Sequence, residues 1–318
     1  MVKAEHPRGL LKGSPVSPSI AAAIMNGKYV NAVPLYRLEK EFERYGLAIT
    51  RQNMANWMIR LGESYISVMY DYLHELIYDY HVIQADETPV LVNKDGRKAG
   101  SKSYMWGYRS GYMNPEKQII LYEYQLTRNA FHPREFLKDF KGICVTDGYQ
   151  VYHTLEKEKE GLTIAGCWVH MRRRFEQRQA IIKPLVDAFF VYLKQNQTGV
   201  PSSGKLHDAF TYALNQEKYL KVLLEDGEVP IDNNASERAI RGFCVGKKNW
   251  QMIDTINGAK TSAMIYSIAE TAKANNLKPY DYFEHLLEEI PKHMEDTDRS
   301  FLNELLPWSD KLPKHIRK

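Results

Sequence analysis

The hydrophobic pattern changes at Tyr80, and this change most constrains what the chain can fold into. Before Tyr80 the apolar residues recur at three- and four-residue steps, which is typical of amphipathic helices. After it come short apolar runs separated by turn residues, which predict strands at 81–92, 104–108 and 118–124 and hence an antiparallel meander. Strand and helix patterns alternate from there on, so we expect a mixed α/β sheet with flanking helices.

The segment before Tyr80 predicts three helices. Pro34 would lie in the first turn of one helix, with Gly46 at its C-terminal end. Thr50 or Asn53 would cap the second helix, and a third would continue to about Tyr80. Two helices joined by a short turn with glycine outline a helix-turn-helix, but a plain helical bundle packed on the rest of the chain fits equally well.

These patterns divide the chain into three regions. Residues 1–80 form a helical N-terminal region, which would bind DNA if it is a helix-turn-helix. Residues 81–275 form the core that contains the sheet, with a helical insertion at about 180–225. Residues 276–318 supply a C-terminal helix and a basic tail over 311–318.

Composition excludes several classes of protein. Of the 318 residues 44% are apolar and 26% charged, which is ordinary for a folded globular protein. No run approaches the roughly 18 apolar residues of a membrane-spanning helix, so we expect no membrane partner. The 3 scattered cysteines form no C-x-x-C pair, which argues against a cysteine zinc site and favours a reducing cytoplasm. A net charge of +4 permits nucleic acid as a partner without requiring it.

Three acidic residues stand at junctions between predicted elements. Asp86 follows an apolar strand, Asp147 ends another, and Glu237 opens a helix. If the two strands are neighbours in one sheet, both aspartates could converge with the glutamate. Three carboxylates at about 4 Å would repel each other by roughly 4 kcal/mol per pair at an effective dielectric constant of about 20, so cations would be needed. Ligands that are all oxygen indicate magnesium or manganese rather than zinc.

A pair of such ions would suit phosphoryl transfer. At about 3.5–4 Å apart, they would activate an attacking oxygen and stabilise the leaving one. Each acid also has a purely structural interpretation, which the spacing leaves open. Asp86 could bond nearby backbone, and Asp147 with Gly148 forms a common turn dipeptide. Glu237 could close a capping box with Asn234.

The segments around these acids form a recognisable series. The longer ones are Gln84-Ala-Asp-Glu-Thr-Pro89, Thr146-Asp-Gly-Tyr149, Gly166-Cys-Trp-Val-His-Met-Arg-Arg-Arg-Phe175 and Asp232-Asn-Asn-Ala-Ser-Glu-Arg-Ala-Ile-Arg241. Shorter ones are Pro34–Arg37, Gly246–Trp250 and Leu305–Trp308. Together they resemble the transposases of the insertion-sequence-66 family over most of the chain, from about residue 15 to 310.

This resemblance implies a ribonuclease-H-like core with a catalytic Asp-Asp-Glu triad, whose matching positions are Asp86, Asp147 and Glu237. It implies a DNA transposase that uses magnesium or manganese, as two bound ions, to cleave and transfer strands at the ends of an insertion sequence. Its partners would be the transposon ends and target DNA. A homo-oligomer on the DNA and accessory proteins of the element are further expected partners.

Two groups of basic residues would then contact DNA phosphates. They are Arg238, Arg241, Lys247 and Lys248 after the third acid, and Arg172, Arg173 and Arg174 on a predicted basic helix. Both groups could follow the phosphate backbone with salt-dependent affinity, or they could be solvated helix faces. His170 could assist at the scissile phosphate, but a histidine beside Cys167 and Trp168 is more often packed.

The chain is shorter than the family pattern in two places. Relatives usually carry a longer N-terminal region with a cysteine-rich zinc module. The stretch after Phe175 also lacks several helical turns that we expect there, which could leave Glu237 without support. Two alternatives therefore stand beside the transposase: a truncated, catalytically inactive DNA-binding remnant, and a related nuclease that cuts branched or hybrid nucleic acid.

Overall fold

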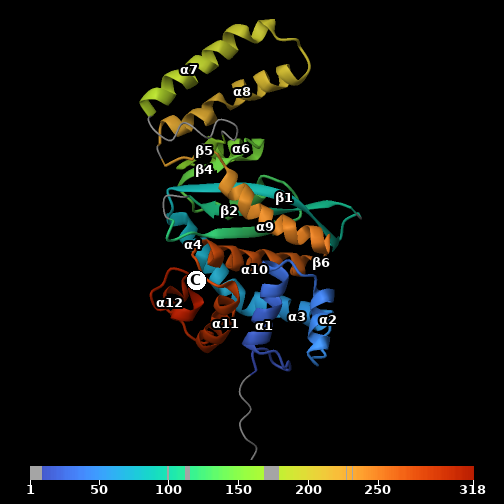
Figure 1. Cartoon of the computed structure of the whole chain (residues 1–318). Helices are drawn as coiled ribbons and strands as arrows, with labels where there is room; N and C mark the ends of the chain where they lie inside the picture. Colours follow the sequence, from blue (N-terminus) through green and yellow to red (C-terminus); the bar gives the residue numbers. More distant parts are fainter. Residues whose placement is uncertain (1–8, 99, 112–114, 168–178, 227, 231) are drawn as a thin grey trace, which may run out of the picture.

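The elements of the chain stack in three tiers (Figure 1). A two-helix hairpin lies at one end, a mixed sheet in the middle and a helical body at the other end. The computed structural model describes residues 9–98, 100–111, 115–167, 179–226, 228–230 and 232–318. Its mixed sheet with flanking helices confirms the predicted α/β class.

The described residues form a six-stranded sheet in the order β3-β2-β1-β4-β5, with β6 also paired to β1. The strands are β1 (Val82–Lys94), β2 (Lys102–Ser110), β3 (Ile120–Gln125), β4 (Gly142–Thr146), β5 (Leu162–Gly166) and β6 (Ile253–Thr255). β1, β2 and β3 pair in antiparallel fashion, which confirms the predicted meander. β4 and β5 run parallel to β1, and β6 is a short strand that the sequence did not predict.

The helices follow the predicted periodicity closely. The α-helices of the described residues are α1 (Pro18–Met25), α2 (Leu35–Arg44), α3 (Arg51–Leu61), α4 (Ser67–Leu76), α5 (Phe131–Phe136), α6 (Gln150–Glu158), α7 (Gln179–Asn196), α8 (Lys205–Lys221), α9 (Asn234–Trp250), α10 (Ile256–Ala274), α11 (Pro279–Glu289) and α12 (Leu302–Leu305). The Thr50 hydroxyl caps α3 by accepting the Asn53 N–H at 3.2 Å, as predicted. Gly46, just after α2, has a φ of +79°, which favours glycine at a helix C-terminal end.

The two faces of the sheet are covered by different helices. α9 lies on one face, where the Tyr122 hydroxyl donates to the Ala239 carbonyl. Gly107 lets this helix come close, since a Cβ there would lie 3.0 Å from Ile240. The opposite face packs on α5 and α6, where Trp106 meets Tyr152 edge to face with ring centres 6.2 Å apart. Alternate residues of β2 therefore point to α9 and to α5–α6.

Helix α10 runs along β3, the strand at the edge of the sheet. Its Thr271 hydroxyl accepts the Ile120 N–H and donates to the Ile120 carbonyl, each at 2.9 Å. Ser267 accepts the Tyr122 N–H at 2.7 Å. Asn275 exchanges two further bonds with the backbone of Gln118. Four helical residues rise about 6 Å and two strand residues about 6.8 Å, so side chains four apart on α10 match the edge groups of β3.

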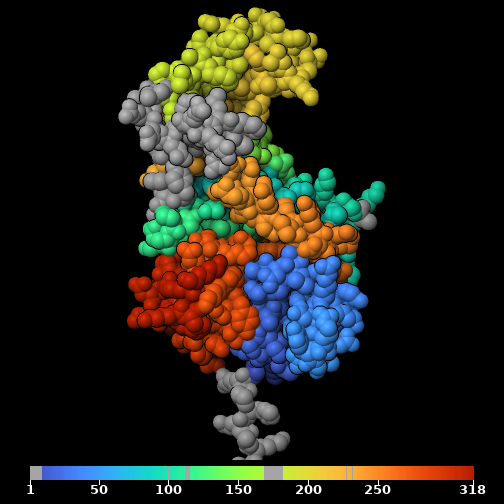
Figure 2. Space-filling view, viewed as in Figure 1, coloured from blue at the N-terminus to red at the C-terminus, as the bar shows by residue number. Residues whose placement is uncertain are grey.

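The helical body combines the two ends of the chain. In Figure 2 the N-terminal helices in blue and the C-terminal helices in red lie side by side, and α1 packs on α11. One apolar core continues from Leu10 to Ile316 and includes the sheet. The expected basic tail is folded against this body: Ile316 is fully buried and its carbonyl accepts the Lys278 N–H at 2.7 Å. Apolar anchors at Leu312 and Ile316 explain the difference from an extended tail.

The hairpin of α7 and α8 has a small apolar cluster of its own. Val186, Phe190 and Leu193 of α7 meet Leu220 of α8 there. α8 also packs on β5, where a Cβ on Gly166 would lie 3.2 Å from Leu220. No helix in the described part of the chain is both long and apolar enough to cross a membrane.

Candidate active site

Two of the three predicted acids lie at neighbouring strands, Asp86 within β1 and Asp147 directly after β4. β1 and β4 pair in parallel with Gln84 opposite Val145. Asp86 stands two residues further along β1, and Asp147 is the first residue after the end of β4, so both acids lie at the same end of this strand pair. The adjacency of these strands was the condition for the predicted convergence of the acids, and it is met.

The asparagine-rich segment before α9 fixes the third acid beside β1. The Asn233 amide donates to the Ala85 carbonyl at 2.8 Å. Gln84 donates to the Asp232 carbonyl at 3.1 Å, and Asp232 in turn accepts the Asn234 N–H at 2.9 Å. α9 thus begins next to Asp86, with Glu237 exposed in its first turn. The helix starts at an Asn233 cap without a side-chain cap bond, so the capping-box interpretation of Glu237 is wrong.

The three carboxylates share one electrostatic environment. Burial raises the pKa of Asp86 to about 7, with a further rise from the charge of Glu87. Asp147 and Glu237 raise the same pKa by repulsion, against a lowering by the Glu87 N–H. Both other acids are therefore close enough to disfavour a negative charge on Asp86.

The acids are not gathered around a common point. No three His, Cys, Asp or Glu side chains among the described residues are arranged to hold a metal ion. Each aspartate also makes the local bond that its structural interpretation predicted. Asp86 accepts the Glu87 N–H at 2.8 Å, and Asp147 accepts the Tyr149 N–H at 3.0 Å.

A buried ion pair ties the two aspartate segments together. Glu87, whose side chain is 1% exposed, accepts a bond from Arg128 Nε at 2.6 Å. The Arg128 guanidinium lies 3.8 Å from the centre of the Tyr149 ring, and the Tyr149 hydroxyl donates to the Arg128 carbonyl at 2.7 Å. The residue after Asp86 is thus linked to the residue two after Asp147. Sequence reasoning missed Arg128, which lies outside every recognisable segment, although Glu87 and Tyr149 lie inside them.

The predicted basic residues of α9 mostly face solvent. Arg238, Arg241 and Lys248 are exposed, and their spacing places them on one face of the helix. None of them forms an ion pair with another described residue. Lys247 is half-buried and donates to the Pro89 carbonyl, so it also holds α9 against β1.

Part of the prediction falls on residues that the structure does not describe. Arg172, Arg173, Arg174 and His170 lie outside the described residues. Cys167 lies inside them, and its Sγ accepts the Asn233 N–H at 2.9 Å. Cys144 is fully buried.

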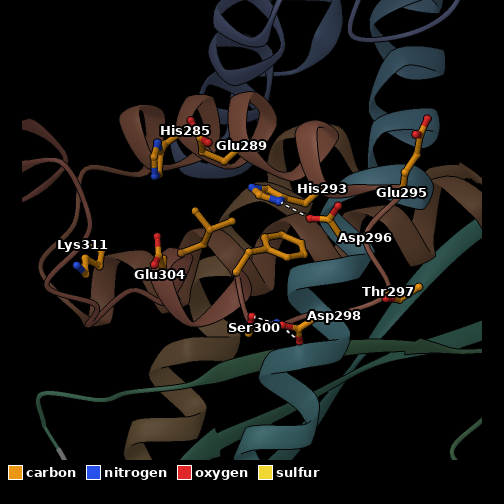
Figure 3. A pocket seen from close by; sticks show the side chains of 12 residues that line it. His285, Glu289, His293, Glu295, Asp296, Thr297, Asp298, Ser300, Glu304 and Lys311 are labelled. Carbon is orange, nitrogen blue, oxygen red and sulfur yellow. Dashed lines mark hydrogen bonds and ion pairs between the residues drawn. The ribbon is translucent and has the colours of Figure 1, made fainter.

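A separate recess of about 730 Å³ lies in the helical body around α11 and α12 (Figure 3). Figure 3 shows His293 bonded to Asp296, at 2.7 Å. The other carboxylates that line this recess are those of Glu289, Glu295, Asp298 and Glu304. This acidic lining would repel phosphates, so the recess is unlike a surface for nucleic acid.

Comparisons with known proteins agree with the motif series. A family model described as "Transposase IS66 family" matches residues 13–182 and 174–261, and one described as "IS66 C-terminal element" matches 267–308. The uncharacterized proteins y4qI and y4jD of Sinorhizobium fredii (strain NBRC 101917 / NGR234) are 26% and 24% identical over 98% and 97% of this chain.

The chain is also shorter than the relatives that it matches. The chain spans 66% and 69% of the length of those two relatives. The alignment with y4qI runs over 358 positions, more than the 318 residues of this chain, so the relative carries residues that this chain lacks. The two pieces of the first family match overlap at residues 174–182. Because the family models cover most of its length, the chain belongs to the IS66 transposase family.

Proposed function

We propose that this chain is a cytoplasmic DNA transposase that cleaves and transfers strands at the ends of an insertion sequence. Asp86, Asp147 and Glu237 are its catalytic triad, on a ribonuclease-H-like core. Two findings support this proposal: membership of the family, and the mixed sheet in which Asp86 lies on β1 and Asp147 directly follows the adjacent parallel strand β4. The substrates are the transposon ends and target DNA.

The grouping of acids carries the proposal, since Glu87, Asp147 and Glu237 all lie close enough to Asp86 to raise its pKa by repulsion. A carboxyl whose pKa is raised to about 7 by burial and by three neighbouring acids holds or releases a proton near neutral pH. Ordinary surface aspartates do not behave in this way. Such a concentration of acids at one place on a sheet is costly for stability, and it is typical of a functional site.

Magnesium or manganese, as two ions, would be held by Asp86, Asp147 and Glu237. The donor chemistry fits, since all the donors are carboxylate oxygens and a divalent cation would offset their repulsion. Because the carboxylates are not gathered around a common point, binding would have to bring them closer together. When bound, the ions would activate the attacking oxygen and stabilise the leaving one.

The chain's own residues would prepare the site for this chemistry. Asp86 would release its proton as the cation binds. Arg128 would keep the Asp147 loop in place through Glu87 and Tyr149. Arg238, Arg241 and Lys248 on the exposed face of α9 would bind phosphates of the DNA strand beside the acids.

The test is nicking of DNA that carries the element's own ends, in the presence of Mg²⁺ or Mn²⁺. Asp147→Asn should lower the rate by about 100-fold or more, because it removes a proposed metal ligand. Lys157→Gln on α6 is the matched control and should nick as the wild type does, since it lies on the opposite face of the sheet. Equal rates for Asp147→Asn and the wild type would contradict the assignment.

A catalytically inactive DNA-binding remnant is the second candidate. Two observations favour it: the carboxylates are not gathered for a metal, and the relative y4qI carries residues that this chain lacks. The remnant would bind DNA with an affinity that depends on salt, and it would not cleave DNA in the presence of Mg²⁺ or Mn²⁺. Cleavage of branched or hybrid substrates without any need for transposon ends would instead indicate the related nuclease.

A further inference from the structure

A recess of about 430 Å³ opens beside the first turns of α9. Three cations from three different elements line it: Arg109 of β2, Arg238 of α9 and Lys273 of α10. The recess also contains one carboxylate, that of Glu270, and this is already paired with Lys273 at 2.7 Å. The lining therefore carries an excess of positive charge, in the two guanidinium groups.

Arg109 is the unusual member of this set. It is half-buried, yet its bonds go to neutral acceptors: Gln118 Oε1 at 2.7 Å and the Ala235 carbonyl at 3.5 Å. Its Nε–H is buried and has no acceptor among the described residues. Burial lowers the pKa of Arg109, and the like charge of Arg238 lowers it further.

Two guanidinium groups that repel each other cost stability unless an anion lies between them. Neither Arg109 nor Arg238 forms an ion pair within the described residues. An arginine presents several N–H donors in a fixed, forked arrangement. This arrangement matches the several oxygens of a phosphate better than it matches a halide ion, which is a single atom. The lining is therefore complementary to a phosphate group.

The recess and the proposed catalytic acids lie on the same face of the sheet. Gly107 of β2 is the pairing partner of Asp86, and Arg109 stands two residues further along β2. Residues two apart on a strand point to the same face, and they lie about 7 Å apart. Arg238 also directly follows Glu237 on α9. A DNA strand with one phosphate in the recess would thus pass close to the proposed catalytic acids.

We propose that Arg109, Arg238 and Lys273 form a pocket for one phosphate of the DNA backbone, which fixes where the strand lies relative to Asp86 and Glu237. This inference rests on the proposed function only for the choice of DNA as the partner. The phosphate contact positions the strand and reads no base sequence.

The deciding experiment measures the binding of a short DNA duplex by fluorescence anisotropy, in EDTA and over a range of salt concentrations. Arg109→Gln should weaken binding about tenfold at 0.1 M salt, as expected for loss of a charged hydrogen-bonded contact. It should also make the slope of log K against log salt shallower by about 1, because one phosphate contact is lost. Arg238→Gln should act in the same direction.

Two further variants separate this effect from a failure to fold. Arg238 is exposed, so Arg238→Gln tests the pocket without a buried substitution. Arg109→Lys keeps the charge without the fork and should restore the salt slope but only part of the affinity. Lys157→Gln removes a positive charge from the opposite face and should leave both quantities unchanged. Wild-type affinity and slope in both Arg109→Gln and Arg238→Gln would overturn the proposal.

A second arm distinguishes backbone phosphate from free phosphate. Inorganic phosphate should raise the Tm of the wild type more than that of Arg109→Gln. Phosphate could raise the Tm of the wild type more than that of Arg109→Gln while Arg109→Gln binds DNA as the wild type does. In that case the pocket binds a free anion, and the proposal is wrong. The binding measurement in EDTA does not depend on catalysis. It therefore tests the phosphate pocket even if the chain does not nick DNA.

Discussion

The two faces of the sheet differ in how their charged side chains are grouped, although the residues of these faces alternate along the same strands. On the α5–α6 face, Glu87 is buried against Arg128, and the Phe136 ring stacks on Tyr108. On the α9 face, Asp86 and Arg109 are partly buried without a partner of opposite charge among the described residues. The α5–α6 face also buries one carboxyl without an ion pair among the described residues, that of Glu123, whose pKa burial raises to about 7. The α9 face differs because like charges cluster there, with Asp86 repelled by Asp147 and Glu237 and Arg109 repelled by Arg238, and a ligand could neutralise them.

The largest expected effect is on the α5–α6 face. Phe136 is 2% exposed and stacks on both Tyr108 and His74. Phe136→Ala should lower the free energy of unfolding by about 3–5 kcal/mol, from lost burial and the cavity that remains. Urea denaturation followed by circular dichroism measures it. A decrease in the free energy of unfolding of less than about 1 kcal/mol would contradict the view that the α5–α6 face is closely packed.

The next effect comes from the buried ion pair. Arg128→Ala leaves the Glu87 carboxylate buried without its partner and should cost about 2 kcal/mol, less than a fully buried pair because Arg128 is 38% exposed. Adding Glu87→Gln should recover part of the loss, since a neutral amide is less costly to bury. A double variant as unstable as Arg128→Ala alone would show that the Tyr149 contact, rather than the ion pair, matters.

Asp86→Asn should stabilise the protein in a pH-dependent way. The folded pKa of about 7 lies above the ordinary value of 3.8, so the folded state keeps a proton that the unfolded chain has already lost. The contribution of Asp86 to wild-type stability therefore falls as the pH rises from about 4 to 7 and is level above it. The Tm of Asp86→Asn should match that of the wild type near pH 4 and exceed it by several degrees at pH 8. If the difference in Tm between Asp86→Asn and the wild type stays constant with pH, the repulsion among acids on the α9 face does not affect stability.

The smallest effect on stability is expected at Arg241. It is exposed and unpaired among the described residues, so Arg241→Gln should change the free energy of unfolding by less than about 0.5 kcal/mol. The salt slope of DNA binding should nevertheless become shallower by about 1. If the slope is unchanged, the exposed face of α9 is only a solvated helix surface.

Local patterns were sufficient to predict the elements but not all of their contacts. The runs after Tyr80 and the turn residues between them predicted β1, β2, β3 and β4, because strand periodicity is visible within a few residues. The Thr50 cap was predictable for the same reason. The short strand β6 was missed because it depends on pairing with Val92 and Lys94, far away in the sequence.

The candidate site shows the same limit. The motif series pointed to Asp86, Asp147 and Glu237, and the register of β1 and β4 explains why the first two lie at the same end of this strand pair. The sequence could not indicate that Arg109 and Arg128 matter, because both owe their roles to contacts across the fold. The sequence likewise could not indicate that Asn233 donates to the Ala85 carbonyl, although Asn233 lies in one of the segments that resemble the family.

The side chains of α10 along β3 have a consequence for how copies of this chain could associate. Ser267, Thr271 and Asn275 occupy backbone groups through which β3 would otherwise pair with a strand from another molecule. At the far edge, the Ile164 N–H of β5 is likewise taken by Glu156. Extension of the sheet from one copy into the next is therefore disfavoured. The oligomer that we predict on DNA would have to join through helices or through the DNA itself.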